Sequence, residues 1–182
     1  MPARLGRLNP MEIFTLLPAV KHYQWGSPSL IPELLGTDNT LGLPYAELWM
    51  GTHPAGTGLV STPEGTIPLG ELISRDPDFW LGGRSRELSF LLKVLGIAAP
   101  LSIQCHPSKQ QAQEGFAREN REGISLDSPV RTYKDANHKP EILCALTEFH
   151  ALCGFRPLDE IRKLCAPLGR EFCSEGDDHQ SL

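Results

Sequence analysis

The sequence predicts a mainly β protein with short helices, and three observations lead to that prediction. Short apolar runs rich in β-branched or aromatic residues recur along the chain, as in YAELWM (45–50), GLVST (58–62) and LSFLLKVLGI (88–97). Glycine (17) and proline (16) are frequent and separate these runs, which is typical of many turns between short elements. The 182 residues suffice for one good-sized domain, or for a domain with part of another.

We expect further strands in EIFTLLPAV (12–20), in PLSIQCHP (100–107) and in the apolar run that Glu141 opens. The helical signals are fewer. They predict helices at 27–36, ending at Gly36; at 69–74; after Ser108, with Gln111 at capping-box spacing and Gly115 near the end; and from Pro157 to a stop before Pro167.

Composition and charge exclude several functional classes. The formal net charge of -5 argues against a nucleic-acid or anionic-membrane partner. No apolar stretch approaches the roughly 20 residues that a membrane-spanning helix needs. The five cysteines form no Cys-x-x-Cys pair, so we expect reduced, small buried side chains and a cytoplasmic protein. Residues 1–10 read as a disordered lead-in, and no signal peptide is expected.

The stretch LSIQCHP (101–107) places two polar side chains two positions apart. In a strand, Gln104 and His106 project from one face while Ile103 and Cys105 point to the other. Two lone-pair donors on one face are either the start of a metal site or an ordinary half-exposed polar pair. The spacing alone leaves both interpretations open.

A second stretch, YKDANHKPEI (133–142), concentrates functional groups in a turn. Asp-Ala-Asn favours a turn, and Pro140 prevents a regular helix. If Glu141 starts a strand that faces Gln104 and His106, it would supply the third of the four ligands of a zinc ion. Lys139 is either a solvated partner of Glu141 or a group tuned for proton transfer by a nearby metal.

These residues resemble the signature of the type I phosphomannose isomerases, which are zinc-dependent. YKDANHKPE (133–141) matches that signature position by position. Four further segments agree: HYQWG (22–26), PYAELWMGTHP (44–54), LLKVLGIAAPLSIQCHPSK (91–109) and CGFRP (153–157). The resemblance covers residues 11–157 and implies a cupin-type β-sandwich (jelly roll), with only the first cupin half on this chain.

The resemblance also implies a ligand set and a cofactor. Carried over to this sequence, the ligands of one Zn²⁺ per chain are Gln104, His106 and Glu141, with a fourth expected beyond Leu182. Cys105, between two of the ligands, is then expected to face the core.

The implied reaction interconverts mannose 6-phosphate and fructose 6-phosphate through an enediol. The resemblance assigns acid/base or polarising duty to Lys139 and His138, and places Lys93 in the sugar pocket. A solvent-reaching strand lysine is the alternative for Lys93. Ser102 is expected to bind the phosphate, and Trp25 to form a pocket wall.

Family members are longer, so we expect this chain to be an N-terminal portion, with residues 158–182 starting a truncated helical insertion and polar tail. Full-length protein is expected to be monomeric and to serve GDP-mannose metabolism. The alternatives are a non-catalytic, metal-binding sugar module and an iron-dependent cupin oxygenase. Gln104 in place of a second histidine counts against the oxygenase.

Overall fold

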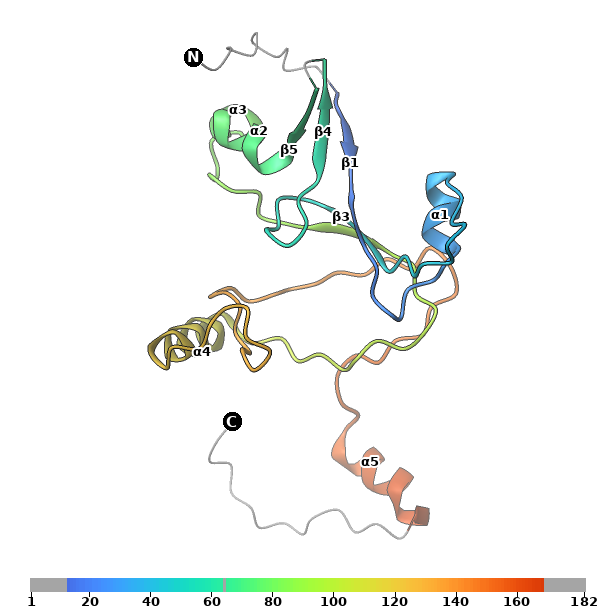
Figure 1. The fold of residues 1–182 in the computed structure, drawn as a ribbon. Coiled ribbons are helices and arrows are strands. Elements are labelled where there is room, and N and C mark those ends of the chain that lie inside the picture. The colour runs from blue at the N-terminus through green and yellow to red at the C-terminus, as the bar shows by residue number, and fades with distance from the viewer. Residues whose placement is uncertain (1–12, 64, 169–182) are drawn as a thin grey trace. The chain divides into compact units, whose positions relative to one another are not determined.

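The computed structural model describes residues 13–63 and 65–168, and the chain divides into two compact units after Gln104 (Figure 1). The elements of the first unit are, in chain order, β1 (Thr15–Leu17), β2 (Ala19–Lys21), α1 (Leu30–Leu35), β3 (Glu47–Met50), β4 (Leu59–Thr62), β5 (Gly65–Pro68), α2 (Leu69–Arg75), α3 (Pro77–Leu81) and β6 (Leu92–Leu95). The second unit contains α4 (Lys109–Arg121), α5 (Leu158–Cys165) and a 3-10 turn, η1 (Ala166–Leu168).

The strands form two antiparallel sheets, in the orders β1-β4-β5 and β2-β3-β6. Pro18 divides the predicted run 12–20 into β1 and β2, which pair in different sheets. A proline has no N–H to donate to a ladder, so the break falls there. β3 is the central strand of its sheet, and its first three residues are buried. The predicted combination of β-strands with short helices is therefore confirmed.

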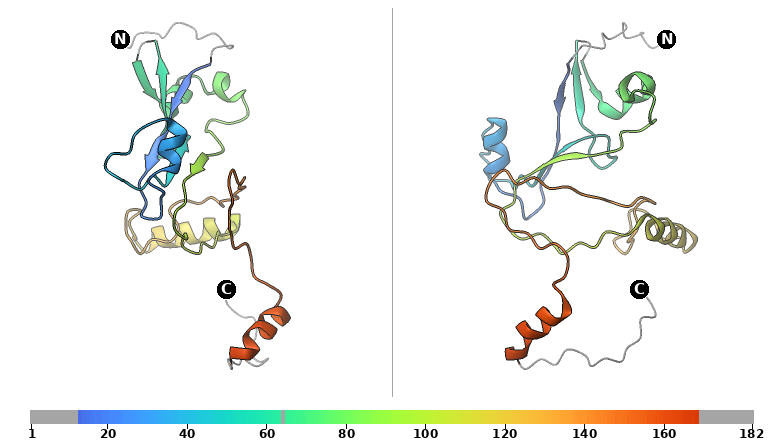
Figure 2. Two further views of the ribbon diagram at one scale, coloured as in Figure 1. Left: turned by 90° about the vertical axis from the view of Figure 1, so that its right-hand side faces the viewer. Right: turned by 180° about the vertical axis from the view of Figure 1, so that it is seen from behind.

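Helices cover part of the first sheet. α2 contacts β4 and β5, and the right-hand view of Figure 2 shows the green helical segment of α2 and α3 next to β5. Leu72 and Ile73 of α2 and Val60 of β4 are buried and contribute to the core. α1 ends as predicted, because Gly36 adopts φ 61°, a left-handed conformation that glycine reaches without steric cost.

The second unit begins with the predicted capping box. The Ser108 hydroxyl accepts the Gln111 N–H, and the Gln111 side chain accepts the Ser108 N–H. The expectation that α4 ends near Gly115 is wrong, because the helix continues to Arg121. Gly115 is an interior residue of α4 that makes room for a neighbouring ring. α5 follows Pro157 as predicted.

Two predicted strands, at 100–107 and from Glu141 onward, are wrong. Within 13–63 and 65–168, no strand follows β6, so neither segment has a ladder partner. In the segment 100–107, Ile103 and Cys105 were expected to lie on the buried face of a strand. Instead, Ile103 is 94% exposed, and Cys105 is exposed rather than in the core. Cys144 and Cys153 are exposed too, which corrects the prediction that they are buried.

The remaining predictions on organisation concern segments at the two ends. The lead-in 1–10, the polar tail from 169 and Cys173 lie outside the described residues. Among the helices of the described segments, none is long and apolar enough to cross a bilayer.

Candidate metal centre

In the second unit, three of the predicted site residues meet at one carboxylate. His106 Nδ1 lies 3.7 Å from Glu141 Oε2, and Lys139 Nζ lies 3.3 Å from Glu141 Oε1. All three side chains are partly exposed, so the group is open to solvent and to small ligands. The sequence separates His106 from Glu141 by a helix and a turn, and the fold brings them together.

The donor atoms of this group fit a zinc ion. Zinc–nitrogen and zinc–oxygen bonds are about 2.0–2.2 Å long, which puts two ligands of a tetrahedral ion roughly 3.4 Å apart. The observed 3.7 Å between His106 and Glu141 differs from that by a few tenths of an ångström. Among the described residues, no group of three or more His, Cys, Asp or Glu side chains is placed to hold a metal ion. Gln104 carries an amide oxygen two positions before His106, as the last residue of the first unit.

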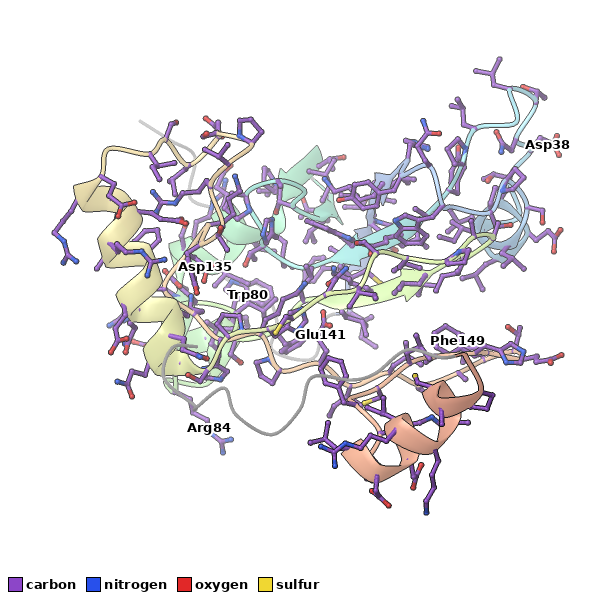
Figure 3. The ribbon with its side chains drawn as sticks, turned by 90° about the horizontal axis from the view of Figure 1, so that it is seen from below. Asp38, Trp80, Arg84, Asp135, Glu141 and Phe149 are labelled. Carbon is purple, nitrogen blue, oxygen red and sulfur yellow. The ribbon has the colours of Figure 1, made fainter. Side chains whose placement is uncertain are left out.

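The turn that carries Glu141 is held by its own side chains. The Asp135 carboxylate accepts the Asn137 N–H at 2.7 Å, which closes an Asx turn. The Asn137 side-chain oxygen accepts a 2.7 Å hydrogen bond from Lys109, the first residue of α4. Figure 3 labels Asp135 and Glu141 on this segment. His138 is exposed in the same turn, next to Lys139.

In the first unit, Lys93 has a buried acidic partner. Its Nζ lies 3.4 Å from Glu47 Oε2 and 4.7 Å from the centre of the Trp49 ring, and its side chain is 23% exposed. The Trp49 indole N–H donates to the same Glu47 oxygen. Lys93 is therefore held against a carboxylate and a ring, which differs from a strand lysine that merely reaches solvent.

Sequence reasoning missed the residues around Lys93. Lys21 Nζ lies 4.5 Å from the Trp49 ring centre and donates to the Ala55 carbonyl. The register pairs Lys21 with Glu47 and Trp49 with Lys93, so one face of the sheet carries all four. The available signal was an acidic residue, Glu47, in the middle of the apolar run YAELWM. Burial, and then the Glu47 charge, raise the pKa of Tyr23.

Two predicted substrate-binding residues are also in the first unit. Trp25 is half-buried, its ring centre lies 5.8 Å from that of Tyr23, and its carbonyl accepts the N–H groups of Ala98 and Ala99. Ser102 is exposed in a segment without regular structure. Their substrate roles stay predictions.

The described residues thus combine two antiparallel sheets with an imidazole–carboxylate pair beside a lysine. The family profile "Phosphomannose isomerase type I, catalytic domain" matches residues 13–158, so the chain belongs to that family.

Individual relatives agree with this assignment. The mannose-6-phosphate isomerase of Escherichia coli K12 is 46% identical over 158 residues, which are 84% of this chain and 40% of that protein. The mannose-6-phosphate isomerase of Homo sapiens is 40% identical over 164 residues, 82% of this chain and 36% of the relative. The chain thus spans about two-fifths of the length of these relatives.

The fold is similar to solved structures of the same family. The Salmonella typhimurium mannose 6-phosphate isomerase, crystallised with fructose 6-phosphate and zinc, superposes with a TM-score of 0.63. It is 42% identical, and the match covers 69% of this chain and 33% of that one. A zinc-bound holo structure of mannose 6-phosphate isomerase gives a TM-score of 0.62 at the same identity.

Proposed function

We propose that this chain carries zinc-binding and proton-transfer residues of a mannose-6-phosphate isomerase, which interconverts mannose 6-phosphate and fructose 6-phosphate. The supporting observation is that the Glu141 carboxylate lies within reach of both His106 and Lys139. Membership of the phosphomannose isomerase family points to the same reaction. The Salmonella relative was crystallised with fructose 6-phosphate and a zinc atom, which supports the choice of substrate and metal.

In this proposal Gln104, His106 and Glu141 hold one Zn²⁺. Their amide oxygen, imidazole nitrogen and carboxylate oxygen are all donor types that zinc accepts. When bound, zinc supplies a Lewis acid that stabilises negative charge developing on the sugar oxygens. Because Gln104 is neutral, the set leaves the ion with more positive charge than two carboxylates would.

Lys139 is the proposed acid/base group. In the aldose-to-ketose direction, it takes the proton from C2 of open-chain mannose 6-phosphate and returns a proton at C1, while a hydroxyl proton moves from O2 to O1. Atoms and electrons balance without an oxidant, since the product is an isomer. His138, adjacent in the turn, polarises the sugar oxygens.

Three residues of the first unit are proposed to contact the sugar phosphate. Lys93, fixed by Glu47, orients a sugar hydroxyl; Ser102 binds the phosphate; and Trp25 forms a wall of the pocket. Each role is supported by the position of the residue within a segment that resembles the family.

We propose a cupin-type β-sandwich as the catalytic domain of residues 11–157, with 158–182 beginning a helical insertion. The two antiparallel sheets and the family match to 13–158 support this division. We further propose a monomeric, cytoplasmic enzyme in mannose and GDP-mannose metabolism, without nucleic-acid or membrane partners. The net charge of -5 supports the proposal that nucleic acids and anionic membranes are not partners.

A coupled assay of mannose 6-phosphate conversion to fructose 6-phosphate, with zinc added, tests the function. Gln104→Ala and Glu141→Gln remove proposed ligands, while Gln113→Ala changes an exposed glutamine of α4 and serves as the matched control. Zinc affinity is measured on the same four proteins by competition with a chromophoric chelator. We expect zinc binding in the parent and in Gln113→Ala and its loss in the ligand variants, and any isomerase activity of this chain should be lost together with the metal.

Other outcomes separate the parts of the proposal. Zinc binding that depends on Glu141 without turnover would mean that this chain holds the metal but does not catalyse the reaction by itself. Activity that survives Gln104→Ala would refute the ligand assignment.

A further inference from the structure

An almost fully buried ion pair joins the second half of α4 to the chain that follows it. The Arg131 and Glu119 side chains are 0% and 6% exposed, with Arg131 Nε 3.0 Å from Glu119 Oε2. The guanidinium also donates to the Tyr133 and Ile124 carbonyls, at 2.7 and 2.6 Å, and to Asn120 Oδ1 at 2.7 Å. All three guanidinium nitrogens therefore have acceptors, as a buried charge requires.

The Glu119 carboxylate also accepts hydrogen bonds from the backbone of the two residues that follow Arg131. Glu119 accepts the Thr132 N–H at 3.2 Å and the Tyr133 N–H at 2.9 Å. Burial pushes the pKa of Glu119 upward, but these N–H groups and the Arg131 charge outweigh it, so the pKa lies below its ordinary value. The carboxylate is thus ionised at neutral pH and holds the start of the segment 133–141.

The Tyr133 ring lies directly against α4. A Cβ added at Gly115 would lie 2.5 Å from both Cδ2 and Cζ of that ring, so only glycine permits this approach. The Arg118 guanidinium lies 5.8 Å from the ring centre. Tyr133 is therefore fixed through both its backbone N–H and its ring.

The same helix also contacts the other end of this segment. Lys109, at the first position of α4, donates to the Asn137 side chain. At the same end of α4, the N-cap residue Ser108 lies two positions after His106 in the sequence. His106 and the turn that leads to Glu141 are thus both attached to the first turn of one helix.

We propose that Glu119 and Arg131 are positioning residues of the metal centre, which hold the turn 133–141 on α4 so that Glu141 meets His106. This inference rests on the proposed function. None of the hydrogen bonds of Glu119 and Arg131 described above involves a candidate ligand, and both residues act through Tyr133 and the turn. The separation of the two ligands is then set by α4 before any metal binds, which reduces the ordering that binding requires.

Zinc affinity of the full chain tests this, with zinc alone as the probe. Glu119→Gln cannot accept both N–H groups as the carboxylate does, and Arg131→Lys keeps the charge but not the three-way hydrogen bonding. Glu114→Gln makes the same chemical change as Glu119→Gln at an exposed position of α4 and is the control. His106→Ala defines binding elsewhere on the chain, including to cysteines. We expect Glu119→Gln and Arg131→Lys to weaken His106-dependent binding by about tenfold, within the range for residues behind metal ligands.

Lys109→Met is a variant at an exposed residue, so folding is expected to persist. Removing a positive charge near the site would by itself strengthen zinc binding, whereas loss of the Asn137 contact would weaken it. Weaker binding supports positioning, and unchanged or tighter binding overturns it for this contact.

A metal-free measurement separates positioning from simple loss of structure and from failure of the proposed function. Amide hydrogen exchange of Asn137 reports on the turn, and that of Ala112 reports on α4 itself. We expect Glu119→Gln to speed exchange at Asn137 by at least severalfold while Ala112 stays protected. Equal exchange at Asn137 in both proteins, or equal acceleration at both amides, overturns the proposal. A parent chain that binds no zinc would refute the metal function, and the exchange experiment would still decide whether α4 holds the turn.

Discussion

Gly115→Ala sets two physical effects against each other inside α4. Alanine is favoured over glycine in a helix interior by about 1 kcal/mol, so propensity alone predicts stabilisation. The new Cβ would, however, lie 2.5 Å from two atoms of the Tyr133 ring, closer than carbon atoms approach without displacement. The ring cannot move cheaply, because the Tyr133 N–H is bound to the buried Glu119.

The magnitude follows from these two terms. Overpacking of this kind costs about 1–3 kcal/mol, and subtracting the propensity gain leaves a net loss of roughly 0–2 kcal/mol. In a Tyr133→Ala background the clash is absent, and the same substitution should stabilise by about 1 kcal/mol. The two backgrounds should therefore differ by about 1–3 kcal/mol, a coupling that a double-mutant cycle measures.

Urea unfolding followed by far-ultraviolet circular dichroism gives the four free energies of unfolding. Gly70→Ala in α2 is the matched control, since its Cβ would meet Thr52 at an ordinary 3.7 Å and should stabilise or be neutral. Stabilisation of about 1 kcal/mol by Gly115→Ala with Tyr133 present would refute the packing argument.

Three further predictions concern single contacts. Ser108→Ala removes the N-cap of α4 and should lower the free energy of unfolding by about 1 kcal/mol in urea titrations; no change would mean that the cap is not formed in solution. Trp49→Phe removes an N–H donor from the buried Glu47 carboxylate and should destabilise by about 1–3 kcal/mol, and an unchanged urea midpoint would count against that contact. Because the pKa of Glu119 is lowered in the folded state, the unfolded chain protonates this carboxylate at a higher pH than the folded chain does. The stability from Glu119 is therefore complete above its ordinary pKa of 4.5 and is lost as pH falls through the folded pKa. The urea-midpoint difference between the parent and Glu119→Gln should shrink as the pH falls below 4.5, and a constant difference would contradict the assignment.

Local signals in the sequence predicted local structure well. The capping box at Ser108 and the C-cap at Gly36 were predicted because their partners lie within a few residues. The helix α3 was missed, although Asp76 accepts the Phe79 N–H as an N-cap and Pro77 occupies the first helical position, where proline is favoured. Gly115 was misinterpreted as a helix end, because its packing partner is distant in the sequence.

Contacts over longer separations were predicted only in part. The meeting of His106 with Glu141 follows from the ligand set that the resemblance implied. The strands expected around both residues do not form in the described structure, because apolar alternation predicts a strand only where a partner strand exists. The Glu47–Lys93 pair and the Glu119–Arg131 pair were missed, since a charged residue in a sequence carries no sign of which distant group neutralises it.

The contacts that hold the turn on α4 differ in sequence separation from those around Trp49, and this bears on the order of folding. Arg131 and Glu119 reach partners 2 to 14 positions away, so their loops are short. Loops of about ten residues close in roughly 10–100 ns, whereas pairing β3 with β6 requires the ends of a much longer segment to meet. We therefore expect α4 and the turn 133–141 to reach native geometry early, before either sheet has formed. A mutation at Glu119 should then slow the formation of this unit, whereas one at Trp49 should mainly affect the slower assembly of the sheet.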